Sequence, residues 1–156
     1  MVIGIGGASR SGKSSLARQL AAEYKAAGKS VLVLDQDDFA FPEADLPRIR
    51  DRADWDQPAS MDFRRLQEHI WAAWARYEVV LVEGILVFYD PEVNALFDRR
   101  IFLEFDKARF WERRKQETRW GEEPDWYLEH VWEAHLKYGR RNFENGRFPI
   151  EIRDSK

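Results

Sequence analysis

Residues 7–14 read G-A-S-R-S-G-K-S, and the apolar run Val2 to Ile5 comes just before them. The stretch fits the phosphate-binding loop pattern G-x-x-x-x-G-K-[ST] at every fixed position. Its glycines let consecutive backbone N–H groups point into one concavity, and the helix that follows adds the positive end of its dipole. We therefore expect nucleotide phosphates to bind here, and the predicted binding residues are Gly7, Ala8, Ser9, Arg10, Ser11, Gly12, Lys13, Ser14 and Ser15.

Two side chains of this loop have the chemistry that phosphate transfer requires. Lys13 would reach the β- and γ-phosphates of ATP as a point charge, and the Ser14 hydroxyl would ligate a Mg²⁺ ion bridging the same oxygens. The alternative is a Gly/Ser-rich turn ahead of an ordinary helix. The strand before the loop and the amphipathic pattern after it, with Leu16 and Leu20 inside and Arg18 outside, favour the phosphate site.

Composition excludes several classes of function. A length of 156 residues predicts one domain, and a hydrophobic content of 44% is ample for its core. The chain has no cysteine, so disulfides and cysteine-based zinc sites are excluded, and we expect a cytoplasmic protein. Its apolar runs are strand-sized and no signal-peptide pattern is present, so we expect no membrane role. A net charge of −3 argues against a nucleic-acid partner.

Short β-branched runs alternate with helical periodicity along the chain. The predicted strands are residues 2–6, 31–35, 79–83 and 101–105, and the predicted helices are residues 13–27, 60–77, 107–119 and 125–145. Strands that are apolar at nearly every position are typical of a parallel sheet covered on both faces. We expect a three-layer α/β P-loop NTPase fold over residues 1–156, with a parallel sheet, helices on both faces and a basic lid.

Two segments of this layout have distinct character. The helix 60–77 carries aromatic and aliphatic residues at helical spacing, which predicts core positions at Phe63, Leu66, Ile70, Trp74 and Tyr77. Residues 36–59 lack periodicity and are rich in Pro, Asp and Arg. Loops of that length are usually functional or disordered.

Acidic residues follow the second and third predicted strands, at the end of the sheet where ligands of open parallel sheets bind. The sequence D-Q-D-D-F occupies positions 35–39, and Glu83 ends the third strand. A carboxylate there can accept a proton from a substrate hydroxyl or belong to the ligand shell of Mg²⁺. We expect Glu83 to have the magnesium role, with capping of a neighbouring loop as the alternative, and Asp35 to belong to a solvated acidic turn.

Four short elements follow one another in an order much more specific than the phosphate loop. They are Q-D-D-F at 36–39, W-D at 55–56, E-G-I-L-V-F at 83–88 and H-V-W at 130–132, with L-K-Y at 136–138 behind. With these elements the chain resembles the nicotinamide riboside kinases, which lie within the uridine kinase-like group of P-loop nucleoside kinases. The resemblance extends from Ile3 to about Arg141.

The resemblance implies roles for particular residues. Asp37 would accept the proton of a ribose 5′-hydroxyl, as the catalytic partner of Lys13, and would also contribute to the metal shell of Ser14 and Glu83. The substrate site would be lined by Asp38, Phe39, Trp55 and Asp56. Relatives usually have Tyr in place of Trp55, a change that keeps the stacking face and loses the phenol.

Residues 107–119 are rich in cations and are followed by Gly121 and Pro124, which predicts a lid over about residues 107–124. Such a segment closes over the phosphates, neutralises developing charge and expels water. By resemblance Lys115 and Arg119 match phosphate- or adenine-side positions, whereas Gln116 stands where the family has a substrate-contacting Arg. The alternative is a solvated basic face balanced by nearby glutamates.

The histidines do not indicate a metal site. His69 fits the pattern of the second helix and is expected to be structural. His130 and His135 are five positions apart, without the Glu and the four-residue spacing of a zinc protease.

Two classes of function remain: a small-molecule kinase and a nucleotide-dependent switch. The chain has neither the D-x-x-G turn nor the N-K-x-D guanine reader of switch GTPases, which favours the kinase. Among acceptors, Trp55 offers a ring for cation–π contact and the acidic loop an electronegative pocket, which favours the cationic nicotinamide riboside over uridine or cytidine. The cations Arg48, Arg50 and Arg52 in the same loop could oppose this preference, and the choice between ATP and GTP stays open.

Overall fold

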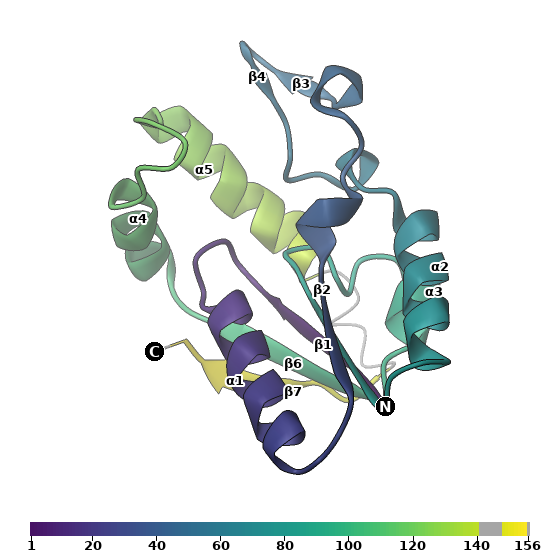
Figure 1. The fold of residues 1–156 in the computed structure, drawn as a ribbon. Helices are drawn as coiled ribbons and strands as arrows, with labels where there is room; N and C mark the ends of the chain where they lie inside the picture. The colour runs from purple at the N-terminus through teal and green to yellow at the C-terminus, as the bar shows by residue number, and fades with distance from the viewer. Residues whose placement is uncertain (141–147, 156) are drawn as a thin grey trace.

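A parallel sheet forms the centre of the molecule. The computed structural model describes residues 1–140 and 148–155. Five strands lie in the order β2-β5-β1-β6-β7, each parallel to its neighbours (Figure 1). They are β1 (Val2–Gly7), β2 (Val31–Asp35), β5 (Val79–Glu83), β6 (Arg99–Glu104) and β7 (Glu151–Asp154).

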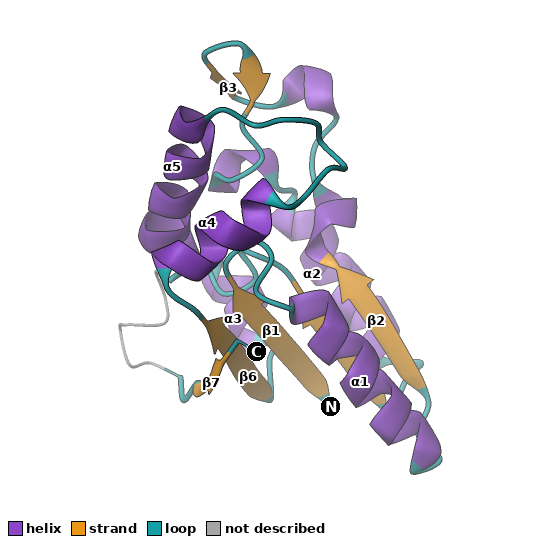
Figure 2. Cartoon of the chain, turned by 90° about the vertical axis from the view of Figure 1, so that its left-hand side faces the viewer, coloured by secondary structure: helices purple, strands orange, loops and turns teal. Residues whose placement is uncertain are grey.

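Helices cover both faces of this sheet (Figures 1 and 2). Because side chains alternate along a strand, Ile3 and Ile5 of β1 pack with Leu20 of α1 (Lys13–Ala26). Val2 points to the opposite face, where α2 (Phe63–Trp74) and α3 (Pro91–Ala95) supply the core partners Leu66, Ile70, Ala73 and Val93. The predicted three-layer α/β architecture is confirmed.

A third cluster lies beyond the carboxyl ends of the strands. It joins α4 (Lys107–Lys115) to α5 (Asp125–Ala134) through Phe110, Tyr127 and Val131, together with Phe105 and Ala8 of the phosphate loop. The rings of Phe105 and Phe110 meet edge to face, with centroids 6.4 Å apart. This cluster holds the basic helix α4 beside the phosphate loop.

Three helix boundaries differ from the prediction. α2 begins at Phe63 rather than Ser60 because the Asp62 carboxylate accepts the backbone N–H of Arg65 and caps the helix. α4 ends at Lys115 rather than Arg119. α5 passes into a π-turn at His135–Gly139, and residues 141–145 of the predicted helix lie outside the described residues.

Four short elements, two of which form one hairpin, were not predicted, because none carries a clear apolar period. Within the loop 36–59, β3 (Arg48–Ile49) and β4 (Arg52–Ala53) form an antiparallel hairpin. The edge strand β7 reads E-I-R-D and is largely exposed. Helix α3 has five residues, although Asp90 as N-cap and Pro91 at its first position are recognisable start signals.

The predicted core stripe of α2 is wrong at one position. Leu66 and Ile70 are buried and Phe63 and Tyr77 pack against the core, but Trp74 is 60% exposed.

Within the described part of the chain, no helix has the length and apolarity that crossing a membrane requires.

Candidate active site

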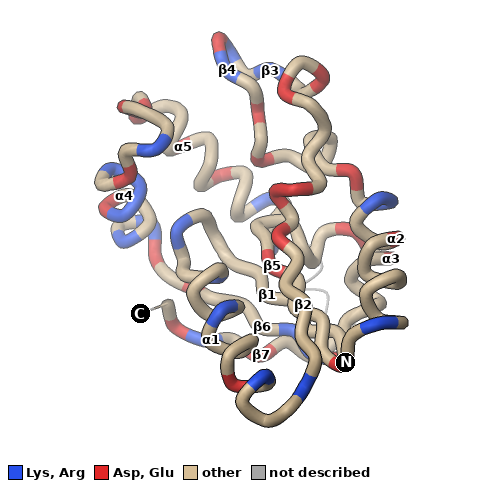
Figure 3. The backbone as a smooth tube through the Cα atoms, viewed as in Figure 1, with Lys and Arg blue, Asp and Glu red and all other residues tan. Residues whose placement is uncertain are grey.

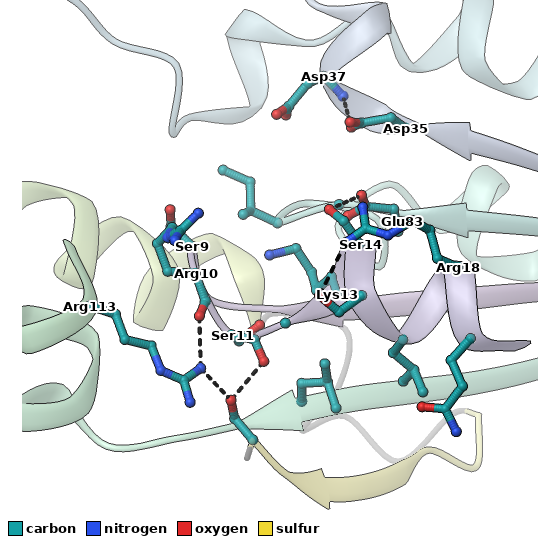
Figure 4. Close-up of a pocket in the computed structure, with 18 of the residues that line it drawn as sticks. Ser9, Arg10, Ser11, Lys13, Ser14, Arg18, Asp35, Asp37, Glu83 and Arg113 are labelled. Carbon is teal, nitrogen blue, oxygen red and sulfur yellow. Dashed lines mark hydrogen bonds between the residues drawn. The ribbon is translucent and has the colours of Figure 1, made fainter. Parts of the chain in front are cut away.

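The carboxyl ends of the parallel strands border a cavity of about 1180 Å³ (Figure 4). Its walls are the phosphate loop, the residues that follow β2 and β5, and part of the basic segment after β6. Figure 4 shows Asp35 and Asp37 across the cavity from Lys13. The charged lining residues are Arg10, Lys13, Arg18, Asp35, Asp37, Glu83, Arg113, Arg119, Arg153 and Asp154.

The phosphate loop has the backbone that its sequence predicts. Gly12 adopts the left-handed region (φ 94°) directly before α1, a conformation that glycine adopts without strain. Lys13 is buried, and its Nζ donates a hydrogen bond to the carbonyl oxygen of Ala8 at 2.8 Å. Burial lowers the pKa of Lys13, opposed by the negative charges of Glu83 and Asp37. The Lys13 side chain is thus fixed by a bond to the start of the phosphate loop, and Lys13 lines the cavity.

Most of the predicted phosphate-binding residues line this cavity. Positions 9–15 all contribute to its wall. Gly7 and Ala8 are not among the described lining residues: Gly7 continues β1, and Ala8 is buried against the aromatic cluster. Gly7 and Ala8 therefore position the start of the loop rather than line the cavity.

Ser14 and Glu83 both line the cavity and contact each other. Ser14 Oγ donates a hydrogen bond to Glu83 Oε1 at 2.5 Å, as Figure 4 shows. Burial raises the pKa of Glu83, opposed by the Ser14 hydrogen bond. Hydroxyl and carboxylate oxygens are ligands that suit Mg²⁺, which usually keeps several waters. The described residues contain no group of three or more His, Cys, Asp or Glu that could hold a metal, so the pair fits an ion that also draws ligands from phosphate and water.

The acidic turn after β2 is ordered by side-chain contacts. Asp35 caps the 3-10 helix Gln36–Phe39 by accepting the backbone N–H of Asp37 at 2.8 Å. Gln36 is fully buried, and its Oε1 accepts the N–H of Leu86 at 2.9 Å. Burial raises the pKa of Asp37, and the neighbouring Asp35 raises it further. Asp35 therefore lines the cavity and fixes the turn, a role that differs from the solvated position expected for it.

Asp38 and Phe39 are not part of the cavity wall as the structure describes it. Asp38 is exposed and its carbonyl oxygen accepts a hydrogen bond from Arg65 at 2.5 Å. Phe39 is buried in the core, with its ring edge to face against His69 at 5.0 Å. Neither is among the described residues that line the large cavity.

Trp55 and Asp56 also lie apart from the large cavity. Trp55 is 40% exposed, and like Asp56 it is not among the described lining residues. Asp56 is buried and, with Ser9 and His135, borders a separate space of about 10 Å³. Burial raises the pKa of Asp56 to about 7, opposed by the positive charge of Arg114. Asp56 is thus a buried acid close to the phosphate loop.

Asp54, which the sequence analysis did not single out, organises this part of the loop. Its Oδ1 accepts the N–H of Asp56 at 3.1 Å, and its Oδ2 accepts a hydrogen bond from Gln57 at 2.8 Å. The same Oδ2 lies 3.0 Å from Nε2 of His130 on α5. His130 is therefore a structural link between the loop and α5.

The arginines of the hairpin pack against α5. The Arg50 guanidinium lies 4.2 Å from the ring centroid of Trp126, and that of Arg52 lies 5.0 Å from the ring centroid of Tyr127. Arg48 donates a hydrogen bond to the carbonyl oxygen of Asp51 at 2.6 Å. None of the three is among the described residues that line the large cavity.

Of the two lid cations chosen from the sequence, the structure brings one to the cavity. Arg119 lines it, and its guanidinium pairs with Glu117 at 3.1 Å. Lys115 is exposed, forms an ion pair with Asp125 and is not among the described lining residues. Figure 3 shows the basic residues of α4 on one side of the phosphate loop and the acidic turn after β2 on the other.

Arg113 and the end of β7 were missed by the sequence analysis. Arg113 lines the cavity and donates hydrogen bonds to the carbonyl oxygen of Arg10 at 2.9 Å and to Ser155 Oγ at 2.8 Å. Ser155 in turn donates to the carbonyl oxygen of Ser11 at 2.7 Å. No sequence signal separates Arg113 from the other cations of its helix, because its role depends on contacts between distant segments.

The buried Asp56 generates a prediction about stability. Its pKa is raised on folding from about 3.8 to about 7, so stability is lost as the pH rises through that window. Asp56→Asn removes the titration, and we expect the free energy of unfolding of this variant relative to wild type to increase by about 1 to 3 kcal/mol between pH 5 and pH 8. Urea unfolding at both pH values measures it. An unchanged difference would mean that Asp56 is ionised throughout, as the partner of Arg114.

Several known proteins with a similar sequence are named as kinases. The chain matches no protein-family model. It is similar to proteins named uridine kinase from Leuconostoc citreum (strain KM20) and Bacillus cereus (strain B4264), each 30% identical over 68% of this chain. The similarity covers 62% and 61% of those two proteins, so the chain spans less than two thirds of their length.

Two solved structures resemble the whole fold. One is a possible uridine kinase from Bacillus stearothermophilus, with a TM-score of 0.68 and 18% identity over 98% of this chain and 88% of that one. The other is a candidate fructose transport system kinase from Silicibacter sp. TM1040, with a TM-score of 0.69 and 25% identity over 97% and 88%. The chain therefore has the α/β fold of P-loop kinases, and its sequence similarities support a relationship to the P-loop nucleoside kinases.

Proposed function

We propose that this protein transfers the γ-phosphoryl group of ATP to the 5′-hydroxyl of a nucleoside. The observation that carries the proposal is the pairing of groups around one cavity. A phosphate loop with Lys13 and the Ser14–Glu83 pair lies on one side, and the carboxylate of Asp37, whose pKa is raised, lies on the other. Similarity to proteins named uridine kinase supports the same reaction class.

Each of these groups has a distinct part in the reaction. The N–H groups of the phosphate loop and the Lys13 ammonium would bind the donor phosphates, while Ser14 and Glu83, with Asp37, would hold Mg²⁺. When bound, the ion neutralises charge on the phosphate oxygens. Asp37 accepts the proton of the acceptor hydroxyl as that oxygen bonds to the γ-phosphorus and the bond from phosphorus to the β–γ bridging oxygen breaks, which releases ADP.

The raised pKa of Asp37 suits this role. A general base works best when its pKa lies close to the working pH, and burial together with Asp35 moves the pKa of Asp37 in that direction. The Asp35 carboxylate also holds the backbone of Asp37 in place. We therefore assign catalysis to Asp37 and Lys13, and orientation of the base to Asp35.

The basic segment 107–124 would form the lid of this site. Arg119 and Arg113 line the cavity on the side of the phosphate loop, where they would compensate charge on the transferring group. Trp120 lies beside them in the same wall, where closure would exclude water. Lys115 would join this set only if it left its ion pair with Asp125.

For the acceptor, uridine and nicotinamide riboside are the two candidates. The similarity to proteins named uridine kinase supports uridine. The acidic residues after β2 support a cationic nucleoside, and Arg50 and Arg52 pack on rings of α5 and are not among the described residues that line the cavity. Trp55 is exposed in this conformation, so its use as a stacking platform would require the loop to close on the nucleoside.

A nucleoside panel with coupled detection of ADP tests the reaction and the acceptor together. We expect ADP release with Mg²⁺–ATP to depend on an added nucleoside. If a pyridinium stacks on Trp55, Trp55→Leu should lower kcat/KM for nicotinamide riboside by up to roughly thirtyfold, and that for uridine by less. Equal losses of kcat/KM for both nucleosides would show that Trp55 contacts the substrate without a specific cation–π interaction. ADP release that no nucleoside stimulates would exclude nucleoside phosphorylation.

The assignment of the base predicts the effect of Asp37→Asn. Asn keeps the shape but accepts no proton, so turnover should fall by about 10² to 10⁴ while ATP binding is spared. In the wild type, kcat/KM should fall as the pH drops through the raised pKa of Asp37, and this acid limb should vanish in the variant. If Asp38→Asn is the crippling change and Asp37→Asn is mild, the base is the neighbouring residue.

A further inference from the structure

Arg114 differs from every other cation of the basic segment. In residues 107–119, all of which the structure describes, it is the one Lys or Arg that is buried, with 8% of its side chain exposed. It is not among the described residues that line the large cavity, whereas its neighbour Arg113 is. The sequence alone presents the two arginines as equivalent.

The guanidinium of Arg114 connects three segments of the chain. Its Nε and Nη2 donate to the two carboxylate oxygens of Glu123, at 2.6 and 3.1 Å, and Glu123 is itself buried. Its Nη1 donates to Ser9 Oγ in the phosphate loop at 2.6 Å. The central carbon of the guanidinium lies 4.4 Å from the ring centroid of Trp120. Helix α4, the loop 116–124 and the phosphate loop thus meet at one side chain.

This geometry is suited to positioning rather than to phosphate binding. A forked pair with a carboxylate is directional, and it fixes the remaining N–H groups of the guanidinium in space. One of those N–H groups donates to Ser9, a phosphate-loop residue that lines the cavity. Since phosphate affinity depends on N–H groups that already point inward, a fixed Ser9 keeps the loop ready for the donor.

We propose that Arg114 is a positioning residue that holds the phosphate loop in its binding conformation through Ser9, with Glu123 fixing its orientation. The inference rests on the proposed function, because it assumes that the loop binds donor phosphates. The proposal distinguishes two kinds of cation in the basic segment. Arg114 is buried and fixes the phosphate loop, whereas cations such as Arg119 line the cavity.

Binding of inorganic tripolyphosphate, measured by titration calorimetry on the full chain, tests this role without requiring the acceptor. Ser9→Ala removes the acceptor of the Arg114 hydrogen bond and leaves the buried Arg114–Glu123 pair intact. Arg114→Lys keeps the charge and removes the fork. We expect each to weaken tripolyphosphate binding by about tenfold, and to raise KM for ATP in proportion with little change in kcat.

A double variant and a matched control test whether Ser9 and Arg114 act through one contact. If they do, Ser9→Ala combined with Arg114→Lys should bind tripolyphosphate no more weakly than the single variants. Arg109→Lys makes the same chemical change at an exposed position of the same helix and should alter binding by less than about twofold.

Several results would overturn the proposal. If the losses of tripolyphosphate affinity in Ser9→Ala and Arg114→Lys add up in the double variant, Ser9 contacts phosphate independently of Arg114. If Arg114→Lys binds tripolyphosphate as tightly as the wild type, the charge at this position is sufficient. A lower melting temperature with unchanged tripolyphosphate affinity would reduce Arg114 to a structural role. If the wild type binds neither tripolyphosphate nor ATP, the proposed function falls together with this inference, whereas intact wild-type binding with unaffected variants removes the inference alone.

Discussion

The parallel direction of the five strands is the constraint on which the rest of the structure depends. Because neighbouring strands share one direction, the chain leaves β1, β2 and β5 at the same edge of the sheet. Residues far apart in sequence meet there: Asp35 ends β2, Glu83 ends β5, and Lys13 begins the helix after β1. The register pairs Ile5 and Asp35 with Glu83, so the acidic groups and the phosphate loop face one cavity.

Opposite charges balance one another around that cavity. Lys13 is buried and would be costly to keep charged by itself, but Glu83, Asp37 and Asp35 all favour its charged form. In return Lys13 opposes the rise in the pKa of Asp37 and Glu83 that burial causes. The charges of Lys13 and these carboxylates therefore partly offset the cost of burying one another, and bound phosphates and a divalent cation would act in the same sense.

The sequence predicts those parts of the site that depend on local pattern. The phosphate loop, the four predicted strands and the covered parallel sheet follow from motif and periodicity, which are properties of neighbouring residues. The cavity position of Arg113 and the burial of Arg114 depend on segments such as Ser9, Glu123 and Ser155 that approach only in the folded chain. Edge strand β7 and the hairpin 48–53 are not predicted by the sequence pattern, because elements so short and exposed carry no apolar period.

The central claim is that this edge of the sheet binds and transfers nucleotide phosphates, and Lys13 tests it most directly. Turnover of ATP with a nucleoside acceptor should fall by roughly 10² or more in Lys13→Ala, the scale of removing one preorganised electrostatic group. Lys25→Ala, which changes an exposed lysine further along α1, should leave turnover unchanged. A Lys13→Ala protein that melts like the wild type and keeps nearly full turnover would contradict the claim.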